Sequence, residues 1–187
     1  MPHEILCPGV RAVPSRVPDA RLTSSGFSLV EMLTTMSVLA ILLVIASPGL
    51  ASLTSSNALA SAQTELAAAT MVARGEAMKR GVPVGLAAVA PVAGSEFSGG
   101  WMVFVDANGN GSYDAGETIV RQQVAYRSDM RIATASGATA LTFNSRGFLA
   151  PSSMVTFTLC SSATRKGYQL RVEPVGLTDV AETTGCP

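Results

Sequence analysis

The chain has 187 residues, of which 48% are apolar and 14% charged, and its 13 basic and 13 acidic side chains give a formal net charge of zero. This length favours one domain plus an appendage. The balanced charge leaves no broad electrostatic footprint for nucleic acid.

Residues 1–26 contain four prolines, scattered arginines and no periodic pattern, which indicates an unstructured leader. An apolar run follows, and no charged side chain occurs between Met32 and Gln63. About 20 apolar residues suffice to cross a bilayer as a helix. We therefore predict a transmembrane segment over residues 27–50, with the leader arginines on the cytoplasmic side.

Glu31 lies almost at the start of this segment. A carboxylate left unpaired in hydrocarbon costs about 2–4 kcal/mol, so an acid here is a candidate functional residue. A secretory signal peptide and a plain single-pass anchor are alternatives, because each also has an apolar segment. Neither has a use for Glu31.

The segment from Leu50 to Arg80 is rich in alanine, and its larger apolar residues recur at helical spacing. These residues are Leu53, Leu59, Leu66 and Met71 or Val72. We predict that the helix continues over residues 51–80, and the alternative is two helices broken near Pro48. Gly81 and Pro83 end the helix.

The remaining residues, 81–187, contain seven short runs of β-branched and aromatic residues separated by glycine, asparagine and serine. The runs are 82–87, 101–105, 118–124, 130–134, 141–143, 154–159 and 168–172. They predict a mostly antiparallel β domain, with residues 88–100 as a loop. The expected fold class is α+β, with a long N-terminal helix packed on a small antiparallel β-rich head.

The start of the apolar segment carries a family resemblance. Gly26, followed by Phe27-Ser28-Leu29-Val30-Glu31 and a long hydrophobic helix, resembles the class III signal of type IV pilins and of their relatives in type II secretion. The resemblance implies that a prepilin peptidase cuts between Gly26 and Phe27 and methylates the new N-terminus. The amine of Phe27 would then pair with Glu31 of a neighbouring subunit during assembly.

Motifs in the predicted β-rich head restrict the resemblance to pilin-like proteins of the GspH/FimT type. The motifs that carry it are residues 100–106, the turn at 108–111, residues 116–121 and 142–147, and a late strand bearing Cys160. The resemblance implies a minor pseudopilin of a type II secretion system, which is not an enzyme. Such a subunit is anchored in the inner membrane by a single pass, with its head in the periplasm.

The implied partners are other pilin-like subunits through the N-terminal helix, the prepilin peptidase, the inner-membrane assembly machinery and secreted cargo. Two alternatives stay open. The first is a minor pilin of a type IV pilus that acts in pilus biogenesis, adhesion or DNA uptake. The second is a calcium-binding or ligand-binding surface anchor protein that never polymerises.

Loss of the leader would remove Cys7 and the only histidine, His3, and leave Cys160 and Cys186. Two cysteines in an oxidising compartment favour a disulfide, which would stabilise the fold by about 3 kcal/mol. Without histidine, the mature chain has no Ser-His-Asp hydrolase site.

One loop has the spacing of calcium ligands. Asp106, Asn108, Asn110, Asp114 and Glu117 fit the twelve-residue EF-hand pattern, in which oxygen ligands alternate along a tight loop. The same run of asparagine and glycine is also what a hairpin loop requires. Calcium is therefore a candidate cofactor, and a purely structural loop is the alternative.

Two further features have mainly structural interpretations. Arg146, Arg165 and Lys166 are the basic residues nearest the distal end, whereas DNA-capturing relatives carry Gly-Arg-x-Arg where residues 176–179 place an acid. Nucleic acid is therefore not a predicted partner. The single tryptophan, Trp101, lies in an apolar run and is expected in the core.

Overall fold

The structure is a computed structural model that describes residues 26–164 and 166–186, with the side chains of residues 46–49 and 51 left outside the description. The predicted leader, with Cys7 and His3, and the basic residue Arg165 lie outside the described residues. The described chain divides into two units, with the boundary between Val44 and Ile45. Each unit is described by itself.

The first element, α1, is a single helix of 52 residues, Leu29–Arg80. The alternative of two helices broken near Pro48 is therefore wrong. The predicted end at Arg80 is confirmed: Gly81 has φ +70°, and its N–H donates to the carbonyl of Ala77 at 2.9 Å, which is a common way to end a helix. Within the described residues, no helix combines the length and the apolar content that a membrane span requires.

The buried stripe of α1 is made mainly of alanine and leucine. Its members are Leu59, Ala62, Leu66, Ala69, Ala73 and Ala77. The prediction was correct for Leu59 and Leu66. Of the alternatives Met71 and Val72, Val72 packs against the core, whereas the prediction was wrong for Leu53, which is 62% exposed. Alanine buries less area than leucine, so Leu59 and Leu66 contribute the largest apolar side chains of this stripe.

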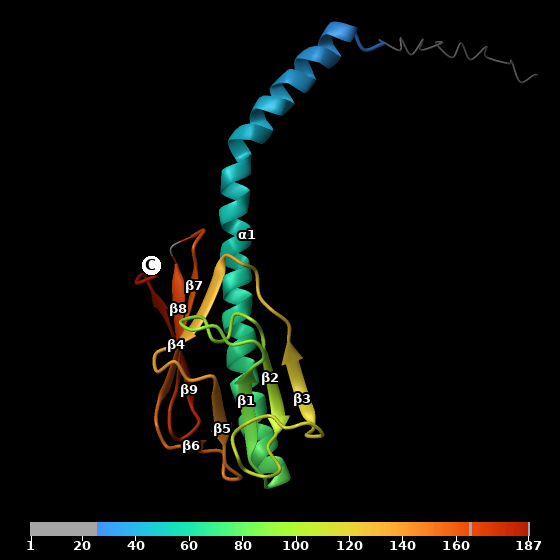
Figure 1. The fold of residues 1–187 in the computed structure, drawn as a ribbon. Coiled ribbons are helices and arrows are strands. Elements are labelled where there is room, and N and C mark those ends of the chain that lie inside the picture. Colours follow the sequence, from blue (N-terminus) through green and yellow to red (C-terminus); the bar gives the residue numbers. More distant parts are fainter. Residues whose placement is uncertain (1–25, 165, 187) are drawn as a thin grey trace, which may run out of the picture. The chain divides into compact units, whose positions relative to one another are not determined.

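Nine strands follow α1 and form two antiparallel sheets in the second unit (Figure 1). The first sheet has the order β3-β2-β1-β5-β6, with bounds Ile119–Gln123, Trp101–Val105, Val84–Ala88, Ala140–Phe143 and Leu149–Ala150. The second has the order β4-β7-β8-β9, with bounds Met130–Thr134, Val155–Ser161, Gly167–Val172 and Thr178–Thr183. The α+β class is confirmed, whereas β6 and β9 were not predicted.

One hydrophobic core joins α1 to both sheets. Trp101 is fully buried in it, as predicted, and its indole N–H donates to the hydroxyl of Tyr126 at 2.9 Å. The connection between β1 and β2, predicted as a loop, also contributes to the core, because the ring of Phe97 packs edge-on against Phe157 at 5.0 Å. The connection between β1 and β2 of the first sheet is thereby packed against β7 of the second.

Candidate functional site

The predicted processing motif lies at the beginning of α1. Gly26 and Phe27 precede the helix, whose first hydrogen bond runs from the N–H of Met32 to the carbonyl of Ser28 at 3.1 Å. Glu31 lies in the first turn, where the unpaired N–H groups of a helix favour negative charge. The structure thus places the glycine just outside the helix and the glutamate just inside it.

The apolar side chains after this motif are exposed in the first unit. Residues 50% or more exposed include Phe27, Leu29, Val30, Met32, Leu33, Met36, Val38, Leu39, Ile41, Leu42, Leu43 and Val44. The hydroxyls of Thr34, Thr35 and Ser37 donate to backbone carbonyls of the preceding turn at 2.8–3.0 Å. Such internal bonds let polar side chains enter an apolar environment. Exposed apolar side chains in this number indicate that the segment is covered by an apolar environment or by other chains.

The predicted calcium loop connects β2 to β3 and is closed by its own hydrogen bonds. Asp106 is fully buried, and its two carboxylate oxygens accept the N–H groups of Asn110 and Gly111 at 3.0 and 2.8 Å. The carboxylate of Glu117 accepts the N–H groups of Ala107 and Asp114 at 2.9 and 3.0 Å. Each end of the loop is therefore held by a carboxylate.

The other predicted ligands complete the same network. The side-chain amides of Asn108 and Asn110 both donate to Asp114 at 2.7 Å. Among the residues that the structure describes, no three acidic, histidine or cysteine side chains form a group able to hold a metal ion. The loop brings all five predicted residues together in an arrangement that fits the structural alternative, and calcium binding stays a prediction.

The predicted disulfide is present between Cys160 and Cys186, whose Cα atoms are 5.6 Å apart. It ties the C-terminal tail to β7. The tail packs so closely over β8 that a Cβ added at Gly167 would overlap the sulfur of Cys186. The disulfide is therefore a structural link across the outer face of the second sheet.

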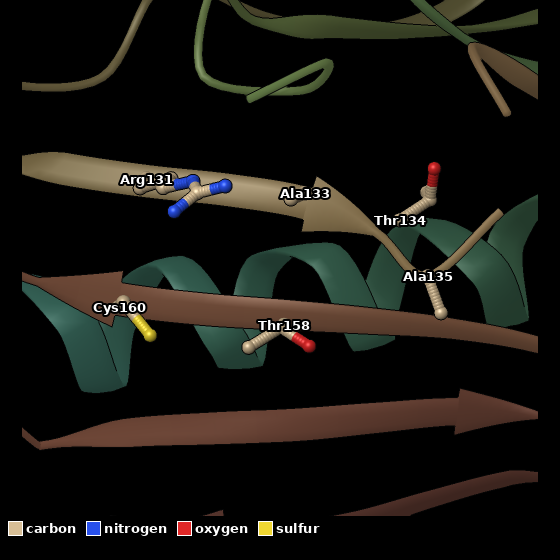
Figure 2. A pocket seen from close by; sticks show the side chains of 6 residues that line it. All are labelled: Arg131, Ala133, Thr134, Ala135, Thr158 and Cys160. Carbon is tan, nitrogen blue, oxygen red and sulfur yellow. The ribbon is translucent and has the colours of Figure 1, made fainter. Parts of the chain in front are cut away.

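A pocket lies beside this disulfide, across β4 and β7 (Figure 2). It is lined by Arg131, Ala133, Thr134, Ala135, Thr158 and Cys160. Arginine is the only charged group in this lining, and the cysteine is disulfide-bonded. The lining contains no side chain that could act as a general base and activate the hydroxyl of Thr134 or Thr158 as a nucleophile.

Two carboxylates that the sequence did not predict lie at the edge of the second sheet. Glu96 is 4% exposed and accepts the N–H groups of Gly94 and Thr134 at 2.8 and 3.0 Å. Asp129 accepts the hydroxyl of Ser55 in α1 at 3.0 Å. No local sequence pattern marks either residue, because Thr134 and Ser55 lie far from them in the chain.

Comparison with known proteins gives two family matches. Residues 62–176 match the family model described as type II transport protein GspH, and residues 21–47 match the prokaryotic N-terminal methylation motif. The pilin-like protein PilA1 of Thermus thermophilus is 35% identical over 153 residues, which cover 78% of this chain and 92% of that protein.

Solved structures give similar folds. The type IV minor pilin FimU of Pseudomonas aeruginosa PAO1 matches with a TM-score of 0.57 and 24% identity, over 72% of this chain and 96% of that one. The minor pseudopilin EpsH of the Vibrio cholerae type 2 secretion system is more distant, with a TM-score of 0.48 and 10% identity over 66% of this chain and 95% of that one.

Proposed function

The chain belongs to the GspH family of type IV pilin-like proteins, the minor pilins and pseudopilins, and on this premise we propose that it is a minor pseudopilin of a type II secretion system. Proteins of this family are structural subunits and not enzymes. One observation carries the proposal: a GspH head over residues 62–176 follows an N-terminal methylation motif at 21–47 in the same chain.

The proposed maturation uses the motif at the start of α1. The prepilin peptidase cuts between Gly26 and Phe27 and methylates the new amine, so the mature chain begins one turn before Glu31. The apolar segment anchors the subunit in the inner membrane, with the head in the periplasm. The exposed apolar residues of this segment support the proposal, because both lipid and neighbouring helices can cover them.

The proposed assembly step pairs charges between subunits. Glu31 is costly in an apolar surrounding unless a cation lies beside it. The amine of Phe27 of a neighbouring subunit is that cation, so packing of helix on helix both neutralises the acid and fixes the register. The assembly machinery of the inner membrane extracts the subunit, and the loops of the head contact other subunits or cargo.

A second candidate function is that of a minor pilin in a type IV pilus. The relative that favours it is the pilin-like protein PilA1, at 35% identity. The two candidates share processing, anchoring and assembly, and differ in the fibre that the subunit enters.

Deletion of the gene in its own host distinguishes the two candidates. A pseudopilin is expected to be needed for secretion of folded proteins and dispensable for surface pili, whereas a minor pilin is expected to show the reverse. The measurements are the protein content of the culture medium and the pili sheared from the cells, with a plasmid copy of the gene as the control. A strain that retains both secretion and pili would contradict both candidates.

A further inference from the structure

The polar residue Ser55 marks the place where α1 begins to be covered by the head. Leu50, Leu53 and Thr54 are exposed, whereas Ser55 is 3% exposed. Ser55 is the first residue along the described part of α1 whose side chain is buried. Leu59 and the rest of the buried stripe follow. At its first buried position in the described part of the chain, the helix therefore presents a hydroxyl rather than an apolar group.

This hydroxyl donates to the carboxylate of Asp129, which lies in the connection between β3 and β4. The distance from Ser55 Oγ to Asp129 Oδ2 is 3.0 Å. The hydroxyl of Ser161, at the end of β7, lies 3.4 Å from the same oxygen. Arg127 Nε lies 3.1 Å from the other carboxylate oxygen. One carboxylate thus joins α1, the connection between the two sheets and the end of β7.

The backbone of Asp129 adds to this junction. Its carbonyl accepts the N–H of Ser162 at 3.0 Å, which fixes the carboxylate in position relative to β7. Burial on its own would raise the pKa of Asp129, but the hydrogen bond from Ser55 and the charge of Arg127 hold that pKa below its ordinary value. The group is therefore ionised at neutral pH and accepts from both hydroxyls.

We propose that Asp129 is a latch that fixes the point at which α1 leaves the head. Ser55 and Ser161 are 3% and 1% exposed, so loss of the carboxylate leaves two buried hydroxyls without this acceptor and frees the first covered turn of the helix. The role of the latch in assembly rests on the proposed function. A force that pulls on the N-terminal half of α1 is transmitted to the head at this turn. The latch keeps the turn bound to the head under that force.

Hydrogen exchange on the purified full chain in detergent tests the latch. The variants are Asp129→Ala, which removes the acceptor, and Ser55→Ala, which removes the donor from the helix side. In both, the backbone amides of residues 52–59 should exchange faster by on the order of tenfold. Exchange in the rest of α1 should not change.

The chain offers a matched control at another hydrogen bond between helix and head. The hydroxyls of Thr70 and Thr178 lie 3.2 Å apart, and Thr70→Val removes this contact well away from Ser55. This variant should leave residues 52–59 unchanged. Unaltered exchange at 52–59 in both latch variants, or an equal increase in the control, would overturn the latch.

Fibre incorporation then tests its role in assembly. Asp129→Ala should reduce the amount of subunit in sheared fibres at least threefold relative to Thr70→Val, at equal amounts in the membrane. Faster exchange at residues 52–59 together with normal incorporation of the subunit into fibres would overturn the role of the latch in assembly. The exchange measurement does not depend on which fibre the chain enters, so failure of the latch and failure of the proposed function give different results.

Discussion

The buried carboxylate of Glu96 completes the open edge of β4, where Phe97 and Ser98 hydrogen-bond to Ile132. This strand lies at one edge of the second sheet, and Glu96 accepts the N–H of Thr134 at 3.0 Å, as a neighbouring strand would. We expect Glu96→Ala to lower the free energy of unfolding by about 1–3 kcal/mol, because buried N–H groups lose their acceptor. Denaturant titration of the purified chain measures this. Glu182→Ala, at an exposed position of β9, is the control and should change little.

Low pH should weaken the hydrogen bonds that Glu96 accepts. Burial would raise the pKa of Glu96, but hydrogen bonds from backbone N–H groups, including those of Thr134 and Gly94, hold it below its ordinary value. A carboxyl whose pKa is lower in the folded state stabilises the fold above about pH 4, and this contribution disappears as the pH falls through the folded pKa. The stability difference between wild type and Glu96→Ala should therefore shrink as the pH falls from about 5 to about 2. A constant difference would show that the charge is not involved.

The loop at Asp106 gives a test that separates structural from metal roles. Both oxygens of Asp106 accept backbone N–H groups, so Asp106→Asn places a donor against a donor and should cost about 1–3 kcal/mol of stability. This loss should be the same with and without millimolar calcium. A rise in the melting temperature of the native chain on adding calcium, abolished by Asp114→Asn, would instead establish the calcium site predicted from the sequence.

Local patterns predicted some of these residues and not others. Cys160 and Cys186 could be paired from the sequence because no third cysteine competes once the leader is removed, and the Asp106 loop was recognisable because its members lie within twelve positions. Glu96 and Asp129 were missed because Thr134 and Ser55, the partners that tie them to other elements, lie 38 and 74 residues away. Only the folded chain brings such pairs together.

Among the elements, the helix and the apolar strands were predictable, whereas the polar strand was not. Helix α1 ends just before Gly81, as predicted from the conformational freedom of glycine. Strand β2, Trp101–Val105, begins and ends at the predicted residues. Strand β9 has the sequence TDVAET, which lacks a continuous apolar pattern. It is a strand because it pairs along its whole length with β8, and tertiary pairing of this kind overrides weak local propensity.

The pairing of β1 with β2 can be tested through a glycine. Gly85 lies opposite Phe104 in the register, and a Cβ added there would overlap the buried Phe104 ring. We expect Gly85→Ala to destabilise the fold by about 1–3 kcal/mol through overpacking. Gly75→Ala is the matched control, because nothing lies within 4 Å of its added Cβ and helical alanine should instead stabilise by about 0.5–1 kcal/mol. Equal effects of the two substitutions on thermal unfolding would refute this account.

For the molecule as a whole, the sequence predicted a helix followed by a β-rich head but not how the head is divided. Two separate sheets share the buried stripe of α1, and the connection that carries Phe97 reaches both. The alanines of that stripe were not recognised as core because alanine is also common on exposed helix faces. Their burial follows from the approach of two sheets to one helix, which no local pattern records.

We propose that assembly of the whole molecule depends on Glu31, which lies at the start of an apolar segment whose side chains are exposed in the first unit. An unpaired carboxylate costs about 2–4 kcal/mol in hydrocarbon, so its removal should favour membrane insertion rather than hinder it. We expect Glu31→Ala and Glu31→Gln to be inserted and cleaved before Phe27 but to enter fibres poorly, because neither can pair with the amine of a neighbouring subunit.

Immunoblots of sheared fibres measure incorporation of these variants, and mass spectrometry of the mature chain measures cleavage. Glu182→Ala, an exposed acid in the head, is the control and should enter fibres normally. Normal incorporation of Glu31→Gln would refute the charge pair, since the glutamine keeps the shape of the side chain and lacks only the charge. A variant that is not cleaved would instead place the role of Glu31 in recognition by the peptidase, before assembly begins.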